Sequence, residues 1–225
     1  MTMSGKLLVM TAVEAEREAL GALSGSDRFE VRLAGVGPIA AAAATASILA
    51  ASAPGTYSLV MSAGIGGGFP GRAEPGELVV ATETAAVELG AETAERDEHG
   101  GGFLPLEELG FGVSRYPADP GTAELLVRRL KEAGLPVVAG PVLTVSTITG
   151  TAETAQKRLR LIPEAIAEAM EGFGVAEAAG RFGLPYAELR AISNRVGPRD
   201  RSSWQMKEAF AALRAASLAM KEAFD

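Results

Sequence analysis

The chain has 225 residues, of which 48% are hydrophobic, and its formal net charge is −7. This length is enough for one sizeable core, so we expect a single domain over residues 1–225. The acidic balance argues against a nucleic-acid partner, because binding to phosphates needs a basic surface.

Carboxylates, amides, hydroxyls and arginines are the side chains left for chemistry, since the sequence has no cysteine and one histidine. This composition argues against a thiolate or histidine-built metal site, and we expect neither a metal nor another cofactor. The first apolar stretch is only about five residues long, too short for a secretory signal, and no apolar run approaches the roughly 18 residues of a membrane span. We therefore expect a cytoplasmic protein that binds a small molecule and no membrane.

Short apolar runs alternate with helical patterns along most of the chain, which is typical of an α/β fold with a central, mainly parallel mixed sheet flanked by helices. The expected strands are 6–11, 29–34, 59–63, 77–81, 141–147, 165–169 and 187–193. The expected helices are 14–23, 38–53, 120–133, 151–160 and 172–182. A capping box, Ser202-x-x-Gln205, predicts a last helix that runs to the C-terminus. Residues 83–114 break this rhythm and predict a long loop.

Ligands of such sheets bind outside the carboxyl ends of the strands. This rule indicates six stretches as the candidate binding edge: Glu14 and Glu16, 35–37, 62–68, 146–149, Met170 with Glu171, and Ser193 with Asn194.

Two glycine runs lie in these stretches. Gly35-x-Gly37-x-x-Ala40 has the form of a dinucleotide fingerprint, but the next strand ends without the acid that would bind a ribose, which favours a tight turn. The denser run SAGIGGGFPG, residues 62–71, would let backbone N–H groups approach an anion or a polar ring, although a flexible turn would need the same residues.

Several polar side chains at this edge are candidates for chemistry. Glu14 and Glu16 can simply complement a helix dipole. Glu171 follows the strand AIAEA after Met170, and Asn194 ends the apolar strand LRAIS, where an amide needs a hydrogen-bond partner.

The charged residues that follow Asn194 are open to two interpretations. Arg195, Arg199 and Arg201 form either a solvated, self-paired loop or a bidentate site for a carboxylate. His99 is a candidate lid residue, and we expect Trp204 in the core or at an interface.

Six motifs occur in a specific order: TAVEAE, AGVG, SAGIGGG, VSTITGT, AIAEAMEGFG and RAISN. With them the chain resembles the purine nucleoside phosphorylase and nucleosidase superfamily, particularly its hydrolytic branch. The resemblance implies a nucleoside phosphorylase-like fold, a nucleoside substrate, cleavage of an N-glycosidic bond, and a homo-oligomer. It also implies that Glu16 polarises the attacking water, that Met170 and Glu171 hold the ribose hydroxyls, and that Ser62, Gly64 and Gly66 lie beside the sugar or anion site.

One position departs from the adenosine-type members of the family, which end the penultimate strand with Ser-Asp, whereas this chain has Ser193-Asn194. The stretch ISNRVGPRDRSSW, with AVELGAE and GFLPLEELGFG, is similar to the branch that releases hypoxanthine from futalosine in an alternative menaquinone pathway. That branch implies that Asn194 reads a 6-oxo purine and that arginines meet a 5′ benzoate. A neutral amide cannot easily protonate the leaving purine, so a water or a protonated neighbour would have to do so.

The candidate residues follow from the motifs and the resemblance together. The candidate catalytic residues are Glu16, Glu171 and Asn194. The candidate substrate-binding residues are Ser62, Gly64, Gly66, Ile148, Met170, Glu171, Ser193, Asn194, Arg199 and Arg201.

Three other functions stay open at this point: a methylthioadenosine/S-adenosylhomocysteine-type nucleosidase, a purine nucleoside phosphorylase, and a non-catalytic nucleotide-binding domain. A phosphorylase needs a phosphate site, and SAGIGGG has no adjacent arginine, which leaves only Arg32 or Arg72. A binding domain would not need Glu16 and Glu171 together.

Overall fold

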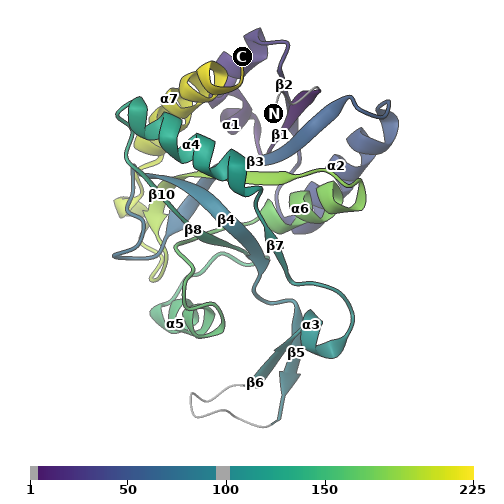
Figure 1. Ribbon diagram of the computed structural model, residues 1–225. Coiled ribbons are helices and arrows are strands. Elements are labelled where there is room, and N and C mark those ends of the chain that lie inside the picture. The colour runs from purple at the N-terminus through teal and green to yellow at the C-terminus, as the bar shows by residue number, and fades with distance from the viewer. Residues whose placement is uncertain (1–4, 95–101) are drawn as a thin grey trace.

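The computed structural model describes residues 5–94 and 102–225 and has a mixed sheet with helices on both faces (Figure 1). The strands are β1 (Lys6–Thr11), β2 (Phe29–Leu33), β3 (Tyr57–Gly68), β4 (Leu78–Ala86), β5 (Gly90–Thr93), β6 (Gly102–Pro105), β7 (Arg115–Pro117), β8 (Val137–Thr144), β9 (Ala167–Ala169) and β10 (Tyr186–Arg195). The α-helices are α1 (Glu14–Ala19), α2 (Pro38–Ala51), α3 (Leu106–Leu109), α4 (Pro120–Glu132), α5 (Ala152–Leu161), α6 (Gly172–Arg181) and α7 (Met206–Phe224), with short 3₁₀ turns at Gly21–Gly25 and Arg201–Ser203.

Half of the sheet closes on itself. Strand β3 pairs with β10, β10 with β4, β4 with β8, β8 with β9, and β9 again with β3. The N-terminal part of β3 pairs in parallel with β1, and β1 pairs with β2, so the sheet extends away from the closed part. Strand β3 therefore lies at the junction of the two halves.

Side chains of β1 alternate between two cores. Leu7 and Val9 pack on the face that carries α4 and α7, whereas Leu8 and Met10 pack on the face that carries α2 and α6. Because successive side chains of a strand point to opposite faces, this continuous apolar run is what a strand covered on both sides requires.

Of the helices in the described ranges, none combines the length and apolar character that a membrane crossing demands.

The structure differs from the predicted elements in four places. The glycine run, which was expected at a strand end, continues β3 as far as Gly68. The predicted loop over 83–114 contains the end of β4, the β5–β6 hairpin and α3, so the scattered acids and glycines concealed short strands.

The capping-box prediction is wrong. Ser202 lies in the 3₁₀ turn, where the Asp200 carboxylate accepts from its N–H at 3.0 Å, and α7 begins at Met206. Since Asp200 caps the turn locally, the side chain of Ser202 is already engaged before the helix starts. The first helix likewise ends at Ala19, and the residues after it form the 3₁₀ turn Gly21–Gly25.

Candidate active site

A pocket of about 220 Å³ opens at the carboxyl edge of the sheet. All six stretches that the sequence assigned to this edge contribute to it, so the structure brings them together around one pocket. Its lining includes Val13, Glu16, Val36, Ile65, Gly66, Gly67, Val145, Ile148, Glu168, Met170, Glu171, Ser193, Asn194, Trp204 and Met206.

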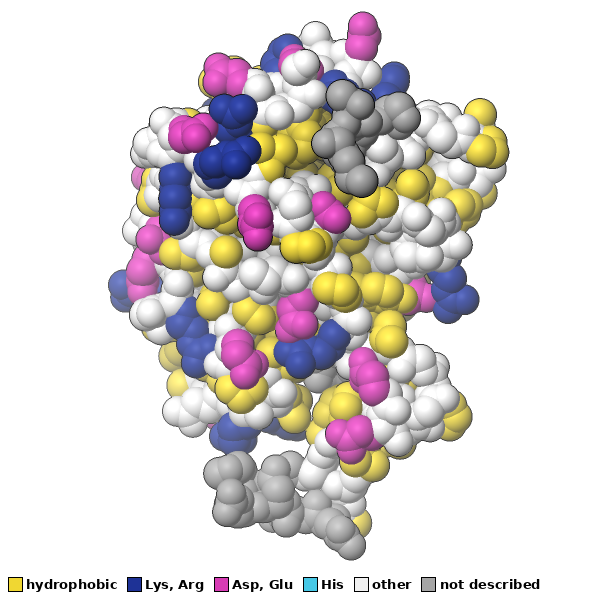
Figure 2. Space-filling model, viewed as in Figure 1, with side chains coloured by type: hydrophobic (Ala, Val, Ile, Leu, Met, Phe, Trp, Pro, Cys, Tyr) yellow, Lys and Arg dark blue, Asp and Glu magenta, His cyan; other side chains and the backbone are white. Residues whose placement is uncertain are grey.

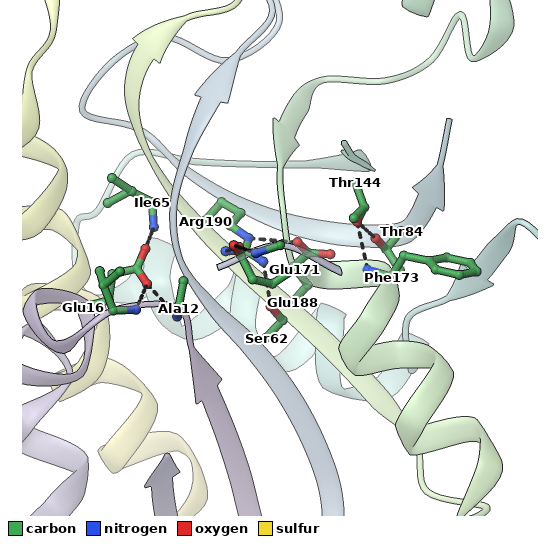
Figure 3. Close-up of polar contacts among 12 residues, drawn as sticks. Ala12, Glu16, Ser62, Ile65, Thr84, Thr144, Glu171, Phe173, Glu188 and Arg190 are labelled. Atoms are coloured by element: carbon green, nitrogen blue, oxygen red, sulfur yellow. Dashed lines mark hydrogen bonds and ion pairs between the residues drawn. The ribbon is translucent and has the colours of Figure 1, made fainter. Parts of the chain in front are cut away.

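Glu16 is held at one side of the pocket by backbone amides. Its Oε2 accepts from the N–H of Ala12 at 2.8 Å and of Val13 at 3.3 Å, and its Oε1 accepts from the N–H of Ile65 at 2.9 Å (Figure 3). Burial raises the pKa of Glu16, although these amides and the charge of Arg190 oppose the rise. Glu14 by contrast pairs with Arg17 on the surface at 2.6 Å.

The glycines of β3 leave space for functional side chains. A Cβ on Gly64 would lie 2.7 Å from Cδ of Glu16, and a Cβ on Gly66 would lie 2.9 Å from the carbonyl oxygen of Glu168. These positions therefore tolerate no side chain while the neighbours stay in place. Gly64 thus leaves room for the Glu16 carboxylate, and Gly66 belongs to the pocket wall.

Arg190 connects the polar groups behind the pocket. It is 1% exposed and is the register partner of Gly64, so it lies beside Glu16. Its Nη2 donates to Ser62 Oγ at 2.6 Å, and its Nη1 lies 3.4 Å from Glu171 Oε2. Burial alone would lower its pKa, but the charges of Glu188, Glu171 and Glu16 outweigh that effect and raise it. Arg190 is therefore a permanent cation beside the Glu16 and Glu171 carboxylates.

Glu171 lies at the N-terminus of α6, where helix geometry and a glycine turn position it. Its Oε1 accepts from the N–H of Gly37 at 3.1 Å, and Gly37 adopts φ +91°, a value that favours glycine. The start of α6 is fixed by Thr144, whose Oγ1 accepts from the N–H of Phe173 at 2.8 Å and lies 3.0 Å from the hydroxyl of Thr84 (Figure 3). The glycine motif at 35–40 is thus a tight turn. Its Gly37 N–H donates to Glu171, the residue expected to bind the ribose hydroxyls.

Asn194 lies at the end of β10 with both ends of its amide engaged. Its Oδ1 accepts from Ser193 Oγ at 2.9 Å, and its Nδ2 donates to the carbonyl of Arg195 at 3.1 Å. Ser193 Oγ also lies 3.2 Å from the carbonyl of Gly66. The Ser193 hydroxyl therefore sets how Asn194 faces the pocket.

The loop that carries Ile148 is fixed by a buried ion pair. Glu168 accepts from the N–H of Thr149 at 2.8 Å and from its hydroxyl at 2.5 Å, and Arg158 lies 2.9 Å from Glu168. Arg158 also donates to the carbonyl of Thr147 at 2.7 Å and pairs with Glu88. Both neighbours of Ile148, Thr147 and Thr149, are therefore held in place by hydrogen bonds.

The arginines after Asn194 are divided between two surroundings. Arg195 pairs with Glu74 at 2.8 Å, so the self-paired interpretation holds for it. The guanidinium carbons of Arg199 and Arg201 lie 5.2 and 5.6 Å from the ring centroid of Trp204. Trp204 is half-buried and lines the pocket, so it does not lie in the core, and its place at an interface stays a prediction; residues 201–206 fold back over the strand ends.

His99, the candidate lid residue, lies outside the described residues. Within the described ranges, no group of three histidine or acidic side chains is arranged to hold a metal ion.

A larger apolar groove of about 580 Å³ adjoins the pocket. It begins close to residues of the pocket, with Pro38 two positions after Val36 and Phe173 two positions after Glu171. Ile39 on its rim is 85% exposed. Figure 2 shows hydrophobic side chains gathered on the side of the molecule that carries α2 and α6 in Figure 1.

Sequence reasoning missed Arg190, Glu188 and Glu168. All three lie within strands, and polar residues that alternate with apolar ones there usually face solvent. The signal for them lies in the fold and not in the local sequence. Strands β9 and β10 are covered on both faces, so a charged side chain in either strand must be buried and paired.

Comparison with known proteins identifies relatives over nearly the whole chain. The family model described as the phosphorylase superfamily matches residues 11–223. The futalosine hydrolase of Streptomyces coelicolor is 48% identical, covering 92% of this chain and 91% of that protein. The futalosine hydrolase of Acidothermus cellulolyticus is 44% identical, covering 95% of this chain and 92% of that protein.

A solved structure supports the architecture. The native structure of the futalosine hydrolase of Helicobacter pylori superposes with a TM-score of 0.79 at 18% identity, covering 98% of this chain and 97% of that one. This likeness confirms the nucleoside phosphorylase-like α/β fold that the motifs predict.

Proposed function

Because the chain belongs to the phosphorylase superfamily, we propose that it is a nucleosidase that hydrolyses the N-glycosidic bond of futalosine and releases hypoxanthine. The observation that carries the proposal is the placement of Glu16, Glu171 and Asn194 around one pocket, with Arg190 between the two carboxylates. In this proposal Glu16 activates the water, Glu171 binds the ribose and Asn194 binds the purine.

Glu16 is the general base. Its pKa is raised by burial, which makes it a stronger base than an exposed carboxylate, and general-base catalysis contributes about 10²–10⁴-fold. As the C–N bond breaks, its electron pair goes to the purine and the sugar becomes oxocarbenium-like. The water oxygen then bonds to the anomeric carbon, its proton passes to Glu16, and the departing purine takes up a proton from a water or a protonated neighbour, so that neutral hypoxanthine is released.

Glu171 holds the ribose. Its carboxylate can accept hydrogen bonds from the 2′ and 3′ hydroxyls, contacts of the kind that strengthen as the sugar gains positive charge. Met170, its neighbour in the pocket lining, supplies apolar contact beneath the ring.

Asn194 reads the purine. Its amide can donate to O6 or N7 and accept from N1–H of hypoxanthine, which exposes an acceptor at O6 and a donor at N1, whereas adenine has the opposite pattern. This assignment favours futalosine over a methylthioadenosine-type substrate. It requires that the amide exchange its internal partners for the base.

A phosphorylase would need an arginine that can bind phosphate, and one does lie beside the glycine run, where Arg190 donates to Ser62. That arginine is already surrounded by the carboxylates of Glu16, Glu171 and Glu188, which would repel a phosphate dianion. Arg72 donates to the carbonyl of Ala165 at 2.7 Å, and Arg32 pairs with Glu30 at 2.9 Å. These surroundings favour water as the nucleophile.

The 5′ side of the substrate extends toward Trp204. Arg199 and Arg201 flank its ring, and their guanidinium groups can pair with the benzoate of futalosine. The aromatic ring of the benzoate would then lie against the pocket end that Trp204 forms.

The apolar groove is the proposed contact with a second copy of the chain. The sequence of α2, PIAAAAATASILAA, has no charged residue, whereas the solvent face of a surface helix normally carries charges. The exposed Ile39 lies on this helix. A homo-oligomer buried here would border the pocket, and Ile39→Glu should convert it to a monomer in light scattering. A parent that is monomeric at all concentrations would contradict the oligomer.

The single-domain organisation and the cytoplasmic location stay predictions.

One assay tests the reaction. The protein is incubated with futalosine, inosine and methylthioadenosine, each with and without phosphate, and the products are identified by mass spectrometry. We expect hypoxanthine and a free sugar from futalosine, independent of phosphate. A sugar phosphate would identify a phosphorylase, preferential release of adenine would identify the methylthioadenosine-type enzyme, and no cleavage would leave a binding domain.

A further inference from the structure

Glu188 is a buried carboxylate that the proposed reaction does not use. It lies on β10 two residues before Arg190, so both side chains point to the same face of the strand. It is 0% exposed. One oxygen accepts from the hydroxyl of Tyr186 at 2.7 Å and the other accepts from Nε of Arg190 at 2.8 Å. Figure 3 shows Glu188 in one cluster with Arg190, Glu171 and Ser62.

The fold makes room for this carboxylate. A Cβ on Gly172 would lie 2.5 Å from Oε2 of Glu188, so the residue directly after Glu171 is glycine where Glu188 needs the space. Apolar residues of similar volume often stabilise a core as well as a buried ion pair does, because both ions lose their hydration. Stability alone therefore gives no reason for a glutamate here.

The reason lies in the geometry of the guanidinium group. This group is planar and rigid, so fixing the direction of Nε also fixes the directions of Nη1 and Nη2. With Nε directed at Glu188, Nη2 meets Ser62 at 2.6 Å and Nη1 faces Glu171 at 3.4 Å. Both partners belong to the candidate site.

We propose that Glu188 is a positioning residue, which directs the guanidinium edge of Arg190 toward Ser62 and Glu171 so that its charge faces the reacting sugar and water. The proposal rests on the proposed function, because it assigns a task within the same site. Glu188 itself lies behind Arg190 and acts through it.

Glu188→Gln is the first test. Glutamine keeps the shape and can still accept from Nε, but it loses the charge that makes such a hydrogen bond strong. We expect kcat for futalosine to fall about tenfold to a hundredfold, the effect of weakening a charged hydrogen bond. KM should change less than about threefold, since the lost contact matters most in the transition state.

Tyr186→Phe is the matched control. It removes the other hydrogen bond to Glu188 and leaves the carboxylate on Arg190, so it should lower the melting temperature while kcat stays within about threefold. Equal losses of kcat in the two variants would overturn the proposal, because packing alone would then explain the effect. So would a Glu188→Gln enzyme whose kcat equals that of the parent.

A second comparison keeps the test decisive if Glu188→Gln does not fold. Arg190→Met is compared with the double variant Glu188→Leu, Arg190→Met, which removes the Glu188 carboxylate together with its partner. If Glu188 acts only through Arg190, the two variants have the same kcat. A further loss in the double variant would overturn the proposal. A parent inactive on futalosine would contradict the proposed function, whereas an active parent with an unaffected Glu188→Gln contradicts this inference alone.

Discussion

The buried charges behind the pocket and the arginines near its mouth solve different problems. Glu16, Glu171 and Arg190 are each at most 6% exposed, and their partners are backbone amides, a hydroxyl, the Glu188 carboxylate or one another. Arg199 and Arg201 are exposed and lie against one aromatic ring. The first group is fixed before the substrate arrives, whereas in the second no guanidinium donor has a hydrogen-bond partner within residues 5–94 and 102–225.

This contrast separates bond cleavage from recognition. Groups that stabilise developing charge work best when they need no reorganisation, which burial and fixed hydrogen bonds provide. Groups that bind the variable end of a substrate contribute mainly to affinity. Substitutions in the buried group should therefore lower kcat, and substitutions in the exposed group should raise KM.

Glu16→Gln should have the largest effect. The amide keeps the shape but cannot take a proton, so we expect kcat to fall about 10²–10⁴-fold while the affinity for substrate, measured by calorimetry, stays largely intact. Glu14→Gln, which alters only a surface pair with Arg17, is the control. Turnover within tenfold of the parent would remove Glu16 from the mechanism.

Gly64→Ala should be next. The added methyl group would displace the Glu16 carboxylate, and a misplacement of about 1 Å can cost about a hundredfold in rate. Gly21→Ala, where the added group meets open space, is the control. Steady-state kinetics of both variants give the comparison; equal rates would mean that Glu16 tolerates movement.

Asn194→Asp should change which base is preferred. A carboxylate opposes O6 of hypoxanthine but can share a proton with N7 of adenine, so the ratio of kcat/KM for futalosine over its 6-amino counterpart should fall. One charged hydrogen bond is worth about tenfold to a hundredfold. An unchanged ratio would show that Asn194 does not read the base.

Arg199→Ala or Arg201→Ala should raise KM for futalosine about tenfold and leave inosine, which lacks the benzoate, nearly unaffected. Arg195→Ala is the matched control, because its guanidinium is paired with Glu74. If all three variants treat both nucleosides alike, the carboxylate binds elsewhere.

The smallest effect concerns pH. Burial raises the pKa of Glu16 above the ordinary 4.5, and its basic form is lost as the pH falls through that raised value. The acid limb of kcat/KM should therefore lie above pH 4.5 and be absent from the residual activity of Glu16→Gln. A limb at or below that value would mean that solvent or substrate offsets the effect of burial.

The sequence predicted the residues at strand ends better than those within strands. Glu16, Glu171 and Asn194 follow apolar runs, and the rule for sheet edges brings such residues together without knowledge of packing. Arg190 and Glu188 lie inside a run, where only the strand order shows that both faces are covered. Trp204 reaches the pocket because the chain turns back after β10, and local sequence does not determine such a return.

The pairing of β3 with β10 has a consequence for how activity appears during folding. Ser62 and Arg190 are 128 positions apart, and the hydrogen bond between them forms only when these strands have found their register. Contacts between distant parts of a chain form slowly, because a long loop must close first. Glu16 and Arg190 therefore come together late, and a nascent chain that has not yet produced β10 has no complete site. Recovered turnover on refolding would thus report this long-range closure rather than the earlier formation of helices.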